Sequence, residues 1–221
     1  MEATFPAFAL VMAVVIMGYA LWLQPRRRAR RVLGRLVNTP IAEIKNGEWA
    51  KVTGIVSMRA PLLTSPIAEQ ECIGFRLDVE SVDEPHRSSL SRAYGARSAV
   101  FERQACGAFT IADDTGQVHV DGPFLLGLEA QGNWSTMRPR LLALLDAAGV
   151  PTLQLASYRG FAFREALLQP GDRVSVLGLA FLEPDPAAPA AGFRSAPLAL
   201  RMRGSVSRPI VVTDVGDGVI S

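Results

Sequence analysis

An uncharged hydrophobic run stands near the start of the chain. It extends from Ala7 to Leu23 (AFALVMAVVIMGYALWL) and ends at Gln24 and Pro25. A helix of this length, at about 1.5 Å per residue, just crosses a hydrocarbon core of about 30 Å. Five arginines follow at once: Arg26, Arg27, Arg28, Arg30 and Arg31. The pattern predicts a transmembrane anchor over residues 1–24 and a basic juxtamembrane connector over residues 25–47.

Two other interpretations of this run fit less well. A cleaved signal peptide has positive charge before the apolar run and small residues at its cleavage site, whereas here the early charge is Glu2. A buried core helix would not be apolar throughout with arginines stacked at one end. The arginines predict that the N-terminus lies outside and the following domain in the cytoplasm, at a cell inner membrane. Tyr19 and Trp22 stand where an interfacial aromatic belt is expected.

Beyond the connector the pattern changes to short alternating segments. Cys72–Val82 alternates most regularly, with Ile73, Phe75, Leu77 and Val79 on one face and Cys72, Arg76 and Asp78 on the other, wetter face. Helix signals are clear once, over 141–148, with Pro139 in the first turn and Gly149 after the end. The other predicted strands are 50–57, 109–112, 117–120, 161–168, 173–182, 198–203 and 210–213. Residues 48–221 are therefore expected to form one mainly β domain, a small OB-like barrel or sandwich with one short helix.

Charge argues against a nucleic-acid partner. The chain has 23 Lys and Arg and 21 Asp and Glu, and five of the arginines and one glutamate lie in the first 31 residues. The remainder carries a net charge of about −2, whereas domains that hold phosphate backbones are normally strongly basic. The charge therefore disfavours nucleic acid as a partner.

Candidate catalytic and metal-binding residues are sparse. Asp114-Thr115-Gly116 resembles the catalytic signature of aspartic proteases, but those enzymes need two carboxylates that share a proton. An acidic β-turn after Asp113 explains the tripeptide, and Gly116 is expected to supply the positive φ of that turn. His119 alternates with its valine neighbours and is expected to face away from them. Cys72 and Cys106, with no CxxC spacing, predict two reduced thiols and no zinc module. We expect no catalysis, no cofactor and no metal.

A polar stretch over 83–99 is predicted to be a long surface loop. Arginines recur along it and just beyond it, with Tyr94 and Phe101 between them. This arrangement is typical of a solvated loop, and it also suits contact with a partner. Arg92, Tyr94 and Arg97 are the candidate partner-contact residues.

The order of the segments resembles the GIDE-type ("beside a membrane") domain family. The resemblance rests on Gly54-Ile55-Val56, Leu63–Pro66, Cys72–Val79, Phe109–Val120 and Glu165–Gly178, with a closing strand from Arg208 to Asp214. The family includes mitochondrial membrane-anchored E3 ubiquitin ligases and many bacterial proteins. Those ligases bind zinc in a RING finger, which two cysteines cannot build. The resemblance implies a RING-less, membrane-apposed interaction domain.

The expected function is that of a single-pass, membrane-anchored scaffold or protein-interaction domain, an accessory subunit of a membrane complex. Its expected partners are the lipid bilayer and a membrane or cytoplasmic protein. The alternative is a membrane-tethered OB-type nucleic-acid-binding protein, which the charge disfavours. A hydrolase that uses Asp113 or Asp114 is the third interpretation, and it lacks partner residues for the carboxylates.

Overall fold

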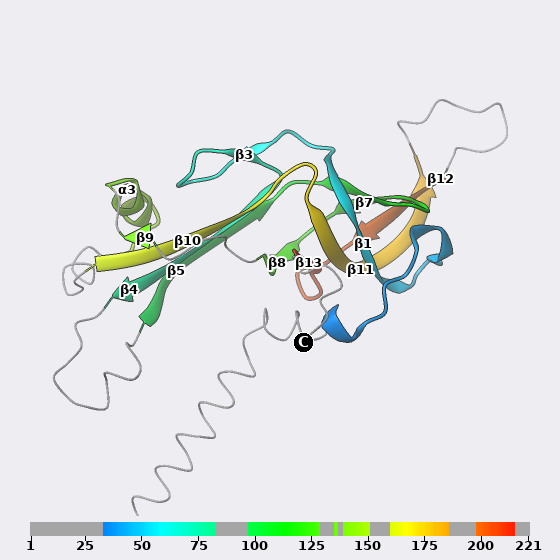
Figure 1. Cartoon of the computed structure of the whole chain (residues 1–221), viewed down its shortest axis with the longest axis horizontal. Helices are drawn as coiled ribbons and strands as arrows, with labels where there is room; N and C mark the ends of the chain where they lie inside the picture. Colours follow the sequence, from blue (N-terminus) through cyan, green and yellow to red (C-terminus); the bar gives the residue numbers. More distant parts are fainter. Residues whose placement is uncertain are drawn as a thin grey trace, which may run out of the picture.

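The structure is a computed structural model that describes residues 33–82, 97–128, 135–136, 139–150, 160–185 and 198–214. Within these residues, β-strands are the dominant elements (Figure 1). The prediction of a mainly β domain is confirmed. The predicted short helix is α3 (Pro139–Ala147), and Gly149 follows it with a φ of 72°. A 3₁₀ turn, η1 (Ile41–Glu43), lies in the connector.

The larger sheet closes on itself. Its neighbours follow the order β1-β6-β7-β12-β11-β13-β8, and β1 also pairs with β11. This extra pairing joins β1, β6, β7, β12 and β11 into a ring, so the sheet is a barrel. Every adjacent pair in the ring is antiparallel except β7 and β12, which are parallel. The strands are β1 (Trp49–Met58), β6 (Phe109–Asp113), β7 (Gly116–Asp121), β8 (Phe124–Leu126), β11 (Arg173–Pro184), β12 (Leu198–Arg203) and β13 (Ile210–Thr213).

Two neighbouring strands of the larger sheet, β7 and β12, end at bends, and a further strand follows each of them, β8 after β7 and β13 after β12. β8 continues the direction of β7, β13 continues that of β12, and β8 and β13 pair in parallel as β7 and β12 do. Gly122 and Gly204 meet at the two bends. A Cβ on Gly122, whose φ is 140°, would lie 3.0 Å from the Gly204 nitrogen, and a Cβ on Gly204 would lie 2.7 Å from the Ile210 nitrogen. Both positions therefore require glycine.

A second, four-stranded sheet extends from the barrel, and we call it the wing (Figure 1). Its order is β5-β4-β10-β9, and α3 packs on one of its faces through Leu141 and Leu145. Its strands are β4 (Gly74–Val82), β5 (Arg97–Cys106), β9 (Ser135–Thr136) and β10 (Gly160–Leu168), and a separate small sheet holds β2 (Leu63–Thr64) and β3 (Glu71–Cys72).

The wing confirms some predictions and corrects others. In β4, Phe75 and Leu77 are buried while Arg76 and Asp78 are partly exposed, as the alternation predicts. The prediction that Cys72 lies on the wetter face is wrong, because Cys72 belongs to β3, pairs with Leu63 and is fully buried. The predicted loop over 83–99 extends too far, since β5 begins at Arg97. The ladder between β4 and β5 shifts register at Val79 and Glu80, and this irregularity breaks the alternation along β5.

Two hydrophobic clusters form the core. The barrel cluster includes Phe109, Ile111, Val118 and Val120, all with 0% exposure, and the wing cluster gathers Leu77, Phe161 and Phe163 under α3. The barrel cluster also contains Ile41 and Ile44 of the connector, so residues 41–44 pack as part of the barrel.

Within the described ranges, no helix has the length and apolar character needed to cross a bilayer. The predicted anchor, residues 1–24, lies outside those ranges.

Candidate functional site

Most of the predicted site residues lie outside the described part of the chain. These are Arg92, Tyr94 and the predicted membrane-interface residues Tyr19, Trp22, Arg26, Arg27, Arg28, Arg30 and Arg31. Arg97 is the first residue of β5, where it pairs with Val82, and its side chain is outside the described part. The partner-contact role of Arg92, Tyr94 and Arg97 therefore stays a prediction.

The acidic turn between β6 and β7 holds the connector. Asp113 Oδ1 accepts hydrogen bonds from the backbone N–H groups of Thr115 and Gly116 and from the Thr115 hydroxyl. Its other oxygen, Oδ2, accepts from the backbone N–H of Ile41 at 3.0 Å, and Thr115 Oγ1 accepts from Ala42 N at 3.2 Å. The first N–H groups of η1 are thus satisfied by the turn, and Asp113 is occupied by backbone contacts.

Hydrogen bonding determines the ionisation of Asp113. Burial by itself raises the pKa of this carboxyl, but the hydrogen bonds from Thr115, Ile41 and Gly116 together lower the pKa below its usual value. Gly116 does not adopt a positive φ, so that prediction is wrong: Asp113 shapes the turn instead. A Cβ on Gly116 would lie 3.2 Å from Ile41 Cγ2, which means that Gly116 makes room for the connector.

Backbone contacts continue along the rest of the connector. Thr39 N donates to Lys51 O at 2.8 Å, Gly47 N donates to Ala180 O at 2.7 Å, and Ala180 N donates to Glu48 O at 2.8 Å. The Asn46 side chain accepts from Leu182 N at 3.0 Å. From Thr39 onward, the connector therefore has a fixed position on the barrel.

Charged side chains gather on the outer surface of the barrel. Arg201 on β12 lies opposite His119 on β7, and both point outward because Met202, Val118 and Val120 point into the core. His119 is also opposite Thr110, whose hydroxyl lies 3.0 Å from its Nδ1. We call Arg59, His119, Glu183, Arg201 and Arg203 the outer-face cluster.

One carboxylate serves two guanidinium groups in this cluster. Glu183 Oε2 lies 2.8 Å from Arg203 Nη2 and 3.6 Å from Arg201 Nε. The side chain of Arg201 is 12% exposed and that of Arg203 is 51% exposed. Burial and then the positive charges of Arg59 and Arg201 lower the pKa of His119, against an opposing effect of Asp185. Burial and the two arginines therefore favour the neutral form of His119.

The sequence signal for this cluster was visible but incomplete. The segment Leu198–Arg203 (LALRMR) was predicted as a strand, and alternation alone places Arg201 and Arg203 on one face. Their neighbour His119 comes from a strand far away in the sequence, in a parallel pairing that no local pattern indicates. The prediction that His119 faces away from Val118 and Val120 is confirmed.

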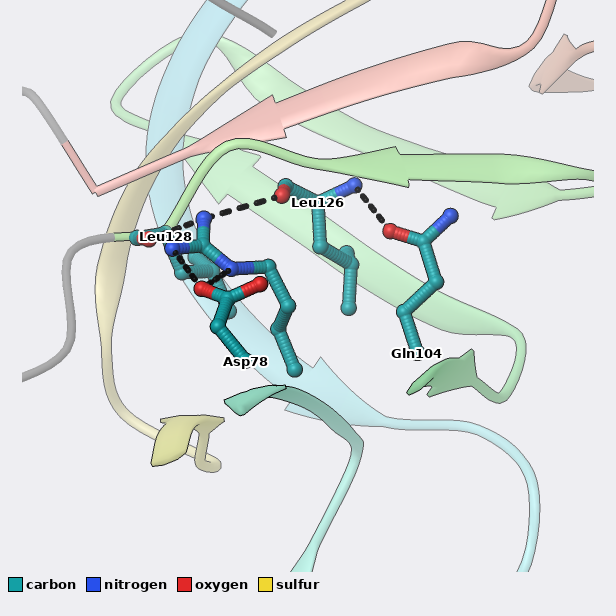
Figure 2. A network of polar contacts seen from close by, with 5 residues as sticks. Asp78, Gln104, Leu126 and Leu128 are labelled. Carbon is teal, nitrogen blue, oxygen red and sulfur yellow. Dashed lines mark hydrogen bonds and ion pairs between the residues drawn. The ribbon is translucent and has the colours of Figure 1, made fainter. Parts of the chain in front are cut away.

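A polar network joins the wing to the barrel (Figure 2). Gln104 donates to Phe124 O at 2.9 Å and accepts from Leu126 N at 3.2 Å, so its amide replaces a neighbouring strand at the edge of β8. Arg76 donates to Leu128 O at 2.6 Å and pairs with Asp78 at 2.6 Å. Arg76 also donates to Leu126 O at 3.4 Å, so Gln104 and Arg76 together bind the backbone along the outer edge of β8.

Cys72 and Cys106 are free cysteines that form no disulfide with each other. Burial and then Glu165 raise the pKa of Cys72, while burial and then Cys72 raise the pKa of Cys106 to about 12. Both groups are therefore thiols rather than thiolates at neutral pH, which disfavours a nucleophilic role. In the described residues, His, Cys, Asp and Glu side chains form no group of three that could hold a metal ion.

A cleft of about 400 Å³ lies at the turn between β10 and β11. Two of its carboxylates are already engaged. Glu165 accepts from Ile67 N and Ala68 N at 3.1 and 2.8 Å, and Asp172 accepts from Gln169 N at 2.7 Å. These contacts hold the loop over residues 65–70 and the turn in place.

No protein-family model matches this chain, and the search of curated proteins finds no similar protein.

Proposed function

We propose that this protein is a RING-less, GIDE-type interaction domain held beside a membrane by a single N-terminal anchor. The observation that carries the proposal is the fixed connector, because Ile41 and Ile44 are buried in the barrel core and Asp113 binds Ile41 N. An anchor that ends at Leu23 is thus followed by residues 24–38 before Thr39 joins the barrel. The barrel would be held close to the cytoplasmic membrane face, with Tyr19, Trp22 and the arginines at the interface.

The strand order favours an OB-like barrel. In chain order, the first three strands of the ring are β1, β6 and β7, and each is antiparallel to the next. The last strand in chain order, β12, runs parallel to the third, β7. Helix α3 precedes the fourth strand of this ring. Small barrels of this kind present a strand face and loops to their ligands, and they serve many unrelated functions. We therefore assign a binding role, as a scaffold or accessory subunit in a membrane complex.

A topology experiment tests the anchor. A reporter that is active only in the cytoplasm, fused after Ser221, should be active, because arginines next to an apolar run stay on the cytoplasmic side. Replacement of Arg26, Arg27, Arg28, Arg30 and Arg31 by glutamine should weaken this orientation. As a control, Arg35→Gln, beyond the cluster, should leave it unchanged. Activity of a periplasmic reporter in the native fusion would contradict the proposal.

A further inference from the structure

Strand β11 is apolar on both of its faces. Val176 and Ala180 are buried in the barrel core, so the residues that alternate with them point away from the core. Three of these outward residues are Leu177, Leu179 and Phe181, and all three are partly exposed. A strand with one face on the core and the other in water normally alternates with polar residues. The outer face of β11 is therefore suited to an apolar contact outside the barrel.

Exposed apolar side chains of β1 and of the connector extend this outer face. Trp49 is 40% exposed and lies opposite Leu179. Lys51, two residues further along the same face of β1, donates from its Nζ to Leu36 O at 3.3 Å. Leu36 and its neighbour Val37 are 40% and 86% exposed. We call Leu36, Val37, Trp49, Leu177, Leu179 and Phe181 the apolar patch.

The apolar patch is close in sequence to the predicted anchor. The uncharged run ends at Leu23, and residues 24–35 separate it from Leu36. A segment of this length spans about 20 Å as a helix and at most about 45 Å when fully extended. The connector is held on the barrel, because Lys51 binds Leu36 O through its side chain and Thr39 N through its carbonyl oxygen. The patch therefore stays within this reach of the end of the apolar run.

We infer that the apolar patch contacts the interfacial region of the lipid bilayer, so that the barrel docks on the membrane in one orientation. The inference rests on the proposed function, in which an anchor holds the barrel beside the membrane, and it names the surface that faces the lipid. Tryptophan favours this region because its ring is apolar while its N–H is polar. Charge contributes little, since the exposed Arg35 and Lys45 before β1 are balanced by the exposed Glu43 and Glu48. The contact is therefore chiefly apolar, and a zwitterionic lipid is sufficient to test it.

Tryptophan fluorescence tests the contact directly. The chain has three tryptophans, so Trp22→Phe and Trp134→Phe together leave Trp49 as the single reporter. The full chain is reconstituted in phosphatidylcholine vesicles, with or without bromine on the upper part of the acyl chains. Because bromine quenches tryptophan only at close range, the Trp49 emission should fall at least about twofold in the brominated vesicles. Unchanged emission would overturn the inference and would leave the patch to a protein partner.

Two further measurements support this test. Should the double variant fail to fold, the native chain is compared with Trp49→Phe, and the native chain should lose more emission to bromine by the share of Trp49. Equal losses would contradict the contact. Met58 is 58% exposed and lies at the other end of β1, about 30 Å along the strand from Trp49. With all three tryptophans replaced by phenylalanine, Met58→Trp should show little quenching, and quenching equal to that of Trp49 would refute a single docking orientation.

Val37→Asp tests the part of the patch that the connector supplies. Val37 is 86% exposed, so the change leaves the core intact, and a charge placed against lipid should weaken the quenching of Trp49 about twofold or more. Met58→Asp is the matched control and should leave the quenching unchanged. Equal quenching in the two variants would overturn the inference. A chain that vesicles do not retain would refute the anchor and the proposed function, whereas a retained chain with unquenched Trp49 would refute the inference alone.

Discussion

Asp113→Asn tests whether the acidic turn holds the connector on the barrel. Asp113 accepts hydrogen bonds from Thr115, Gly116 and Ile41. Asparagine keeps one acceptor oxygen for the turn, but its NH₂ group then faces the Ile41 N–H, donor against donor. A hydrogen bond to a charged group contributes about 1.5–3 kcal/mol when buried, and the turn is partly exposed, so we expect the free energy of unfolding to fall by about 1–2 kcal/mol.

The effect should depend on pH in a defined direction. Because the folded-state pKa of Asp113 is lowered, its ionisation stabilises the protein above the unfolded-state pKa of about 3.9. This stabilisation is lost as the pH falls through the folded-state pKa. The difference between native protein and Asp113→Asn, measured by urea unfolding, should therefore be full at neutral pH and should shrink on acidification below about pH 4.

Asp114→Asn is the matched control. Asp114 is the adjacent carboxylate, and it is exposed and takes no part in the hydrogen bonds to Ile41, Thr115 and Gly116. Its replacement should lower stability only modestly and should leave the exchange rate of the Ile41 amide unchanged, whereas Asp113→Asn should accelerate that exchange. Identical urea midpoints for the two variants at neutral pH would refute the role given to Asp113.

Two further predictions concern the wing. Phe75 is 4% exposed, so Phe75→Ala should lower the free energy of unfolding by about 3–5 kcal/mol in urea unfolding, and a loss below about 1 kcal/mol would contradict its burial. Gln104→Ala should accelerate hydrogen exchange at the Leu126 amide, whose N–H donates to Gln104 Oε1, but not at the Gly127 amide, whose N–H donates to Val212 O. Unchanged exchange at Leu126 would show that Gln104 does not protect the edge of β8.

Strands β4 and β7 show most clearly why a strand can be predicted, because each buries one face. Phe75 and Leu77 in β4, and Val118 and Val120 in β7, alternate with more polar residues, and this period of two is visible without knowledge of the neighbours. Strand β5 was not predicted, because Glu102 and Arg103 interrupt its pattern beside a register shift. Its place in the wing is determined by pairing with β4, which local sequence does not encode.

The candidate site depends still more on long-range pairing. Arg201 and His119 are adjacent because β12 runs parallel to β7, and Glu183 reaches Arg201 and Arg203 because β11 pairs with β12. Each of these side chains has an ordinary local context in the sequence. Similarly, the burial of Cys72 follows from the short β2–β3 pairing, which overrides the alternation that extends from β4.

The interleaving of the two sheets has a consequence for how the chain folds. The wing strands β4 and β5 lie in sequence between β1 and β6, and β10 directly precedes β11. The pairings of β1 with β11 and of β4 with β10 therefore close long loops, whose entropy must be lost before these contacts form. During synthesis, β1 and β4 remain without these partners until most of the chain has been made, and their apolar faces are exposed to wrong association in that interval. The barrel closes only when β12 reaches both β11 and β7, so we expect folding to be slow and to finish at the C-terminal strands.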